Sequence, residues 1–146
     1  MKVVTDSNVF FRAILGRKVG TASKMVINLI RDGKVVSYTC DALMGEIWRI
    51  VKSDPKLNKI NPVYFQQFFD DIEWRISYVP MKNLEHDQKM LNGIGNDWYL
   101  IAICRSISAN YMITYDRDLL SMKDELKDQD DIDVLTSEDF MELYRK

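Results

Sequence analysis

The sequence is poor in the side chains that build zinc and disulfide sites. It has two cysteines and one histidine among 146 residues. Cys40 and Cys104 lie far apart in the chain, without the short spacing that is typical of metal ligands or of a disulfide framework. A structural zinc site is therefore almost excluded. His86 lies in a polar stretch that gives it no evident catalytic setting, and we expect both cysteines to be free, buried thiols.

Long apolar runs and an excess of positive charge are also missing. No apolar run approaches the roughly 20 residues that a membrane-spanning helix needs, and the chain opens on a strand pattern rather than on a signal sequence. The formal net charge is −2, so the chain lacks the overall basic character of many nucleic-acid binders. We therefore expect a cytoplasmic protein without membrane contact, in which any nucleic-acid surface is a local basic patch.

Short apolar runs alternate with amphipathic helical patterns along the whole chain, which is long enough for one domain. Strands are predicted over 2–5, 35–38, 76–79, 111–114 and 132–135. Helices are predicted from Ser7-Asn8, and over 21–32, 41–53, 62–74, 97–108, 117–122 and 138–145, the last with Ser137 as its cap. The polar stretches 80–96 and 123–131 are predicted as loops, the first with or without one helical turn. This alternation predicts an α/β fold with a parallel sheet that helices cover on both faces.

Two acidic residues directly follow predicted strands. Asp6 ends the run Val3-Val4-Thr5, and Asp116 follows the strand over 111–114. Ligands of open parallel sheets bind beyond the carboxyl ends of the strands. The alternative is that each aspartate only caps the next helix. Capping alone does not require these two aspartates, because Ser7, Asn8 and Asp118 are also suited to that role.

Two further acids lie on predicted helices. Glu46 shares a helix face with the apolar residues Leu43 and Ile50. An unpaired buried carboxylate is costly, so we expect Glu46 to contact a cation or a hydrogen-bond network, with a pair to Arg49 as the alternative. Asp97 lies in the first turn of the helix over 97–108, where the helix dipole alone also favours an acid.

Four carboxylates in one pocket would repel one another unless a cation neutralises them. Ligation by oxygen alone, without histidine or cysteine, suits Mg²⁺ or Mn²⁺. Such an ion activates water and stabilises displacement at phosphorus. The predicted metal-binding and catalytic residues are Asp6, Glu46, Asp97 and Asp116.

Four segments resemble the PIN-domain family over essentially the whole chain. They are VVTDSNVFFRAIL at the start, CDALMGEIWRIV around Glu46, NDWYLIAICRSISANYMIT from Asn96 onward, and TYDRDLL around Asp116. The opening Asp-Ser-Asn is a weak signal alone. Its combination with the later acid, helix, strand and T-x-D-x-D-L pattern is specific.

The resemblance implies one PIN domain over residues 1–146, a three-layer α/β/α sandwich with a parallel sheet of four or five strands. It implies an endoribonuclease that depends on Mg²⁺ or Mn²⁺ and uses the four acids, with Asp118 as a supplementary metal ligand. Asn8 and Thr114 match the polar residues that support the site. The sequence is especially similar to VapC-like toxin components of toxin–antitoxin pairs, which implies a cognate antitoxin. The run Leu91–Asn96 departs from the subgroup, since it lacks an acid-rich stretch before the third acid.

RNA binding needs cations near the acids. Arg12 on the first predicted helix and Arg117 beside Asp116 are the candidates, and the basic segment 52–59 is expected to be a solvated loop. The helix over 62–74 has more aromatic residues than one buried face needs. The alternatives for that surplus are a homodimer contact, a partner helix or simply more core.

Three other functions compete with a toxin ribonuclease. A phosphotransferase of the haloacid-dehalogenase kind also places an aspartate after its first strand, but it needs a second aspartate where this chain has Asn8. A PIN-like scaffold or binding module without catalysis would be expected to have lost one of the acids, and all four are present. A housekeeping RNA-processing nuclease would use the same acids, and the sequence does not distinguish it from a toxin.

Overall fold

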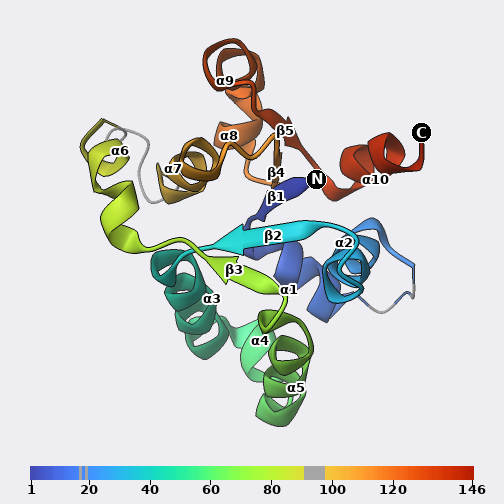
Figure 1. Ribbon diagram of the computed structural model, residues 1–146. Coiled ribbons are helices and arrows are strands. Elements are labelled where there is room, and N and C mark those ends of the chain that lie inside the picture. The colour runs from blue at the N-terminus through green and yellow to red at the C-terminus, as the bar shows by residue number, and fades with distance from the viewer. Residues whose placement is uncertain (17, 19, 91–97) are drawn as a thin grey trace.

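The computed structural model describes residues 1–16, 18, 20–90 and 98–146. Five strands form one sheet in the order β3-β2-β1-β4-β5, and every neighbouring pair is parallel (Figure 1). The parallel sheet predicted from the sequence is thereby confirmed. The strands are β1 (Lys2–Thr5), β2 (Val36–Thr39), β3 (Ile76–Tyr78), β4 (Tyr111–Ile113) and β5 (Asp133–Leu135).

Helices cover both faces of the sheet, as Figure 1 shows. Val3 belongs to the core on one face and Val4 to the core on the other, and both are fully buried. Burial on both faces explains why β1 and β4 read as apolar runs, whereas the edge strand β3 exposes Ser77 and Tyr78. The first core includes residues of α1 (Ser7–Leu15), α2 (Ala22–Arg31), α3 (Asp41–Ser53), α4 (Pro55–Asn58), α5 (Pro62–Glu73) and α10 (Ser137–Arg145). The second includes residues of η1 (Met81–Leu84), α7 (Trp98–Ile107), α8 (Arg117–Ser121) and α9 (Lys123–Asp130).

The order of the strands locates a crevice. From β1 the chain adds β2 and then β3 on one side, and it returns to place β4 on the other side of β1. Val4 of β1 therefore pairs with Tyr38 of β2 and with Met112 of β4. Adjacent strands whose connections run in opposite directions open a crevice at their carboxyl ends, where ligands bind in sheets of this kind. In this chain that point lies between β1 and β4.

Two helix caps decide an alternative that the sequence left open, and a third differs from the prediction. Asp6 and not Ser7 or Asn8 caps α1, Asp116 and not Asp118 caps α8, and Thr136 and not Ser137 caps α10. In each case the cap is the residue whose extended backbone directs a side-chain oxygen at the free N–H groups of the first turn. The capping role that the sequence left open for Asp6 and Asp116 is therefore present in the structure.

Three segments predicted as loops contain helices instead. Each helical segment buries a single leucine: Leu57 in α4, Leu84 at the end of η1, and Leu126 in α9. Between η1 and α7 the chain also forms α6 (Glu85–Met90). The sequence allowed one helical turn within 80–96, and the other helices were missed because one apolar residue in a polar segment produces no periodicity. None of the helices in the described part of the chain has the length and apolar character needed to cross a membrane.

Candidate active site at the carboxyl edge of the sheet

Asp6 lies at the carboxyl end of β1 and is buried, with 4% of its surface exposed. Its Oδ1 accepts a hydrogen bond from the backbone N–H of Ser7 at 2.7 Å. Its Oδ2 accepts one from the hydroxyl of Thr114 at 2.6 Å and a longer one from the amide of Asn8 at 3.3 Å. A buried carboxylate is tolerated only with partners of this kind, so the surroundings of Asp6 are built to hold an acid.

Thr114 connects the first acid to the fourth. It follows β4 and is fully buried. Its hydroxyl donates to Asp6 and accepts from the backbone N–H of Asp116 at 3.0 Å. One hydroxyl therefore sets the position of Asp6 relative to the chain that carries Asp116, across the crevice between β1 and β4.

Asn8 makes a second connection between the same two segments. Its side-chain amide donates to Asp6, and its side-chain oxygen accepts from the backbone N–H of Tyr115 at 3.2 Å. Asn8 and Thr114, which the resemblance marked as polar support, thus both contact Asp6 directly. Their contacts also show why the amide of Asn8 suits this position, since it supplies one donor and one acceptor.

Asp116 is half-buried and caps α8. Its Oδ1 accepts from the backbone N–H groups of Asp118 at 2.8 Å and of Leu119 at 3.1 Å. Its Oδ2 accepts no hydrogen bond from any residue that the structure describes. One oxygen of Asp116 is therefore committed to the helix, while the other is available to a cation or to solvent.

Glu46 contacts both a tyrosine and an arginine. Tyr99 of α7 donates its hydroxyl hydrogen to Oε2 of Glu46. Arg49 lies 3.9 Å from Oε1, with 68% of its side chain exposed against 20% for Glu46. The expected alternative of a pair with Arg49 is thus present, but at this distance and exposure it stabilises little. These three residues and Ala42 line a cavity of about 220 Å³.

Burial raises the pKa of the Asp6 carboxyl above its ordinary value, and the negative charge of Glu46 raises it further. The hydrogen bonds from Thr114 and Ser7 act in the opposite direction and lower that pKa. Glu46 therefore lies close enough to Asp6 for their charges to repel each other. A cation bound between them would relieve this repulsion.

The predicted set of four acids is only partly visible. Asp97 lies outside the described residues. Within residues 1–16, 18, 20–90 and 98–146, no three Asp, Glu, His or Cys side chains are grouped closely enough to hold a metal ion. Asp118 and Arg117 are exposed on α8. The structure thus brings together Asp6, Thr114, Asn8 and the Asp116 backbone, with Glu46 nearby, and the four-acid metal site stays a prediction.

Two tyrosines at this edge of the sheet were not predicted as part of the site. Tyr99 contacts Glu46, as described above. Tyr115 is bonded through its backbone to Asn8, and the guanidinium carbon of Arg12 lies 3.6 Å from the centre of its ring. The only sequence signal was position, since Tyr115 stands between Thr114 and Asp116. The contacts of Tyr99 and Tyr115 join segments that are far apart in the chain, and no local sequence pattern reveals such contacts.

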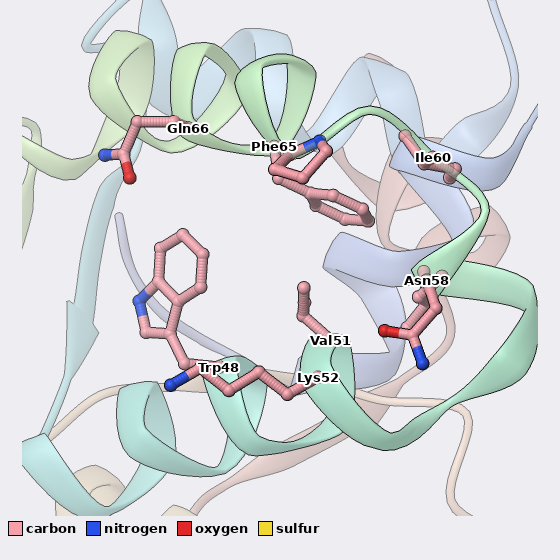
Figure 2. Close-up of a pocket in the computed structure, with 9 residues that line it drawn as sticks. Trp48, Val51, Lys52, Asn58, Ile60, Phe65 and Gln66 are labelled. Carbon is pink, nitrogen blue, oxygen red and sulfur yellow. The ribbon is translucent and has the colours of Figure 1, made fainter.

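A second, apolar cavity of about 260 Å³ lies between α3, α4 and α5. Figure 2 shows Trp48 and Val51 of α3 facing Phe65 and Gln66 of α5 across it. None of the predicted site residues lines it. On α5, Phe65 is buried whereas Tyr64 is exposed, so part of the aromatic surplus is core and part lies at the surface. The predicted homodimer or partner contact stays a prediction.

Comparison with known proteins supports the fold. No protein-family model matches the chain, and no curated protein matches it. Among solved structures, the chain is similar to one in the crystal structure of VapBC2 from Rickettsia felis bound to a DNA fragment from their promoter. The two are 13% identical, with 92% of this chain and 97% of that chain covered and a TM-score of 0.55. A likeness at this identity concerns the fold, and it confirms the PIN-like α/β fold predicted from the sequence.

Proposed function

We propose that this protein is a metal-dependent endoribonuclease and the toxin component of a toxin–antitoxin pair. The observation that carries the proposal is the setting of Asp6. This carboxylate is buried at the strand crossover point and is held by Thr114, which follows the neighbouring strand β4. Its burial raises its pKa, and the charge of Glu46 raises that pKa further. Carboxyls whose pKa is shifted by burial and by a neighbouring charge in such a crevice are typical of functional sites.

The residues present fit a hard divalent cation. The donors are carboxylate oxygens, which Mg²⁺ and Mn²⁺ prefer, and Oδ2 of Asp116 is free of hydrogen bonds from the described residues. Asp6, Glu46 and Asp116 would hold the ion together with Asp97, and Asp118 is a further candidate. When bound, the ion would supply an activated water for attack on a phosphodiester. Thr114 and Asn8 hold Asp6 in place during that reaction.

The cleavage that we propose is hydrolysis of RNA to a 5′ phosphate and a 3′ hydroxyl. Arg12 and Arg117 are both exposed on the helices that follow the two aspartates. They would supply the positive charge that an RNA backbone needs in a chain whose net charge is −2.

The toxin role rests on two supports. One is the resemblance of the four sequence segments to VapC-like toxins, and the other is the fold shared with a chain from VapBC2. On this basis we propose an antitoxin protein as a partner. A housekeeping RNA-processing nuclease would have the same chemistry and no such partner, so co-purification of the chain with the product of a neighbouring gene distinguishes the two.

The test of catalysis uses two matched substitutions of helix-capping aspartates. Asp6 caps α1, and Asp54 caps α4 by accepting from the backbone N–H of Lys56 at 2.8 Å. Cleavage of single-stranded RNA with Mn²⁺ is expected to be abolished by Asp6→Asn and retained by Asp54→Asn. Full activity of a folded Asp6→Asn protein would refute the proposed mechanism.

One observation favours a binding module without catalysis. Asp6 and Asp116 both cap helices, and Glu46 contacts Tyr99 and Arg49, so each of these three acids has a structural use. Under this alternative the acids would bind no metal. Calorimetric titration with millimolar Mn²⁺ separates the two, because heat of binding that Asp6→Asn abolishes supports the nuclease and an absence of heat supports the binding module.

A further inference from the structure

A cavity of about 360 Å³, lined by polar and apolar groups, lies directly beside the proposed active site. Tyr115, which immediately precedes Asp116, forms part of its wall, and Arg12 of α1, Glu138 of α10 and Ser23 add further polar groups. The backbone of Tyr115 is bonded to Asn8, which in turn donates to Asp6. Any group bound in this cavity therefore lies next to the proposed cleavage site.

Arg12 and Tyr115 form a flat platform at this cavity. The Arg12 guanidinium carbon lies 3.6 Å from the centre of the Tyr115 ring, and the Arg12 side chain is exposed. An arginine stacked in this way keeps one planar face and its N–H edges free. Unpaired RNA bases stack on such guanidinium planes, and the N–H edges are able to contact a phosphate of the same nucleotide.

Glu138 supplies a hydrogen-bond acceptor in a fixed position. The hydroxyl of Tyr115 donates to Oε2 of Glu138 at 2.6 Å. The Tyr115 hydroxyl also lies 3.2 Å from the buried hydroxyl of Ser23, which lies 3.1 Å from that of Ser137. This network of hydroxyl groups orients the carboxylate. Its other oxygen, Oε1, accepts no hydrogen bond from any described residue.

We propose that Arg12, Tyr115 and Glu138 form a subsite that binds the RNA base next to the cleaved phosphodiester and selects guanine. Guanine offers two adjacent N–H donors on its Watson–Crick edge, which match the two oxygens of a carboxylate. Adenine and cytosine offer one amino group each. Uracil places carbonyl oxygens on both sides of its single N–H, and these would be repelled by Glu138.

The inference rests on the proposed ribonuclease function, and separate measurements of binding and of cleavage distinguish the failure of one from the failure of the other. RNA binding is measured without divalent cations, so that nothing is cut, by fluorescence anisotropy of four labelled single-stranded oligonucleotides. All four are uridine chains, and they differ at one internal position that is G, A, C or U. Cleavage sites are then mapped separately on the same four with Mn²⁺.

The decisive variant is Glu138→Gln, with Glu142→Gln as its control. Glu142 is exposed on the same helix, one turn further along, and has the same charge. A well-formed carboxylate contact to a base is worth enough to discriminate by about tenfold, so we expect the wild type to bind the G oligonucleotide about that much more tightly than the U one. Glu138→Gln is expected to remove this preference and Glu142→Gln to leave it.

Arg12→Lys keeps the positive charge but removes the planar face. It is expected to weaken binding of all four oligonucleotides and to leave the order among them unchanged, because Glu138 still selects the base. Equal binding of all four by the wild type, or an unchanged G preference in Glu138→Gln, overturns the subsite. A G preference in binding without any cleavage in Mn²⁺ supports the subsite and refutes the nuclease. Cleavage without a G preference in binding supports the nuclease and refutes the subsite.

Discussion

Replacement of Thr114 by valine removes one hydroxyl group and keeps the shape of the side chain. Thr114 is fully buried, and its hydroxyl donates to Asp6 at 2.6 Å and accepts from the Asp116 backbone at 3.0 Å. A hydrogen bond to a charged group contributes about 1.5–3 kcal/mol and a neutral one about 0.5–1.5 kcal/mol. We therefore expect Thr114→Val to lower the free energy of unfolding at neutral pH by about 2–4 kcal/mol.

The pH dependence of this loss identifies its cause. The Thr114 hydrogen bond lowers the pKa of Asp6, although burial keeps that pKa above its ordinary value of 3.8. The hydroxyl therefore stabilises the ionised carboxylate most, and the part of its contribution that depends on the charge of Asp6 is lost as the pH falls through the pKa of Asp6 in the folded protein. The stability difference between wild type and Thr114→Val is expected to be largest at neutral pH and to shrink on acidification toward 3.8.

Urea unfolding monitored by circular dichroism, repeated over a pH series, measures this difference. Thr114→Ser is the control, because it keeps the hydroxyl and loses one buried methyl group, at a cost of about 1 kcal/mol that does not depend on pH. If valine costs no more than serine, or if its cost is the same at neutral and acidic pH, the hydroxyl does not hold an ionised Asp6 and the description of the site is wrong.

Three further predictions concern the packing of the fold. Phe69 is fully buried against Phe10 and Trp48, so Phe69→Ala is expected to lower the free energy of unfolding in urea by about 3–5 kcal/mol. Tyr64 is exposed on the same helix, and Tyr64→Ala should lower it by under about 0.5 kcal/mol. Cys40 and Cys104 are buried, and burial raises the pKa of both thiols. A thiol reagent at mildly alkaline pH should therefore label neither cysteine in the folded protein and both cysteines in urea. Fast labelling of the native protein would contradict their burial. Leu126 is the buried residue of α9, and Leu126→Ala is expected to lower stability by about 2–5 kcal/mol, whereas a solvated loop at 123–131 would show almost no change.

The central strands β1 and β4 were predictable because they are buried on both faces. Val3 and Val4 pack into different cores, so the whole strand must be apolar and its pattern is visible in the sequence. The acids at the strand ends were predictable for a related reason, since a parallel sheet brings all carboxyl ends to one edge. Because Asp6 and Asp116 directly follow strands in the sequence, their location at this edge of the sheet could be predicted.

The features that escaped prediction depend on contacts between distant segments or on a single side chain. Leu57 and Leu126 each hold a short helix in place by their burial, and a lone apolar residue leaves no periodic signal. Tyr99 contacts Glu46 from another helix, and Tyr115 receives Arg12 and Glu138 from opposite ends of the chain. Capping of α10 by Thr136 instead of Ser137 depended on which residue took the extended backbone at the helix start.

The central claim is that carboxylates at the carboxyl edge of the sheet bind a divalent cation. The most direct measurement is an anomalous difference map from crystals of the protein grown with Mn²⁺. The account predicts a peak within coordination distance of the Asp6 and Asp116 carboxylates, with Glu46 and Asp97 as the other candidates for its ligands, and no such peak in Asp6→Asn crystals. A map without a peak at this edge, or with Mn²⁺ bound only elsewhere on the surface, would contradict it.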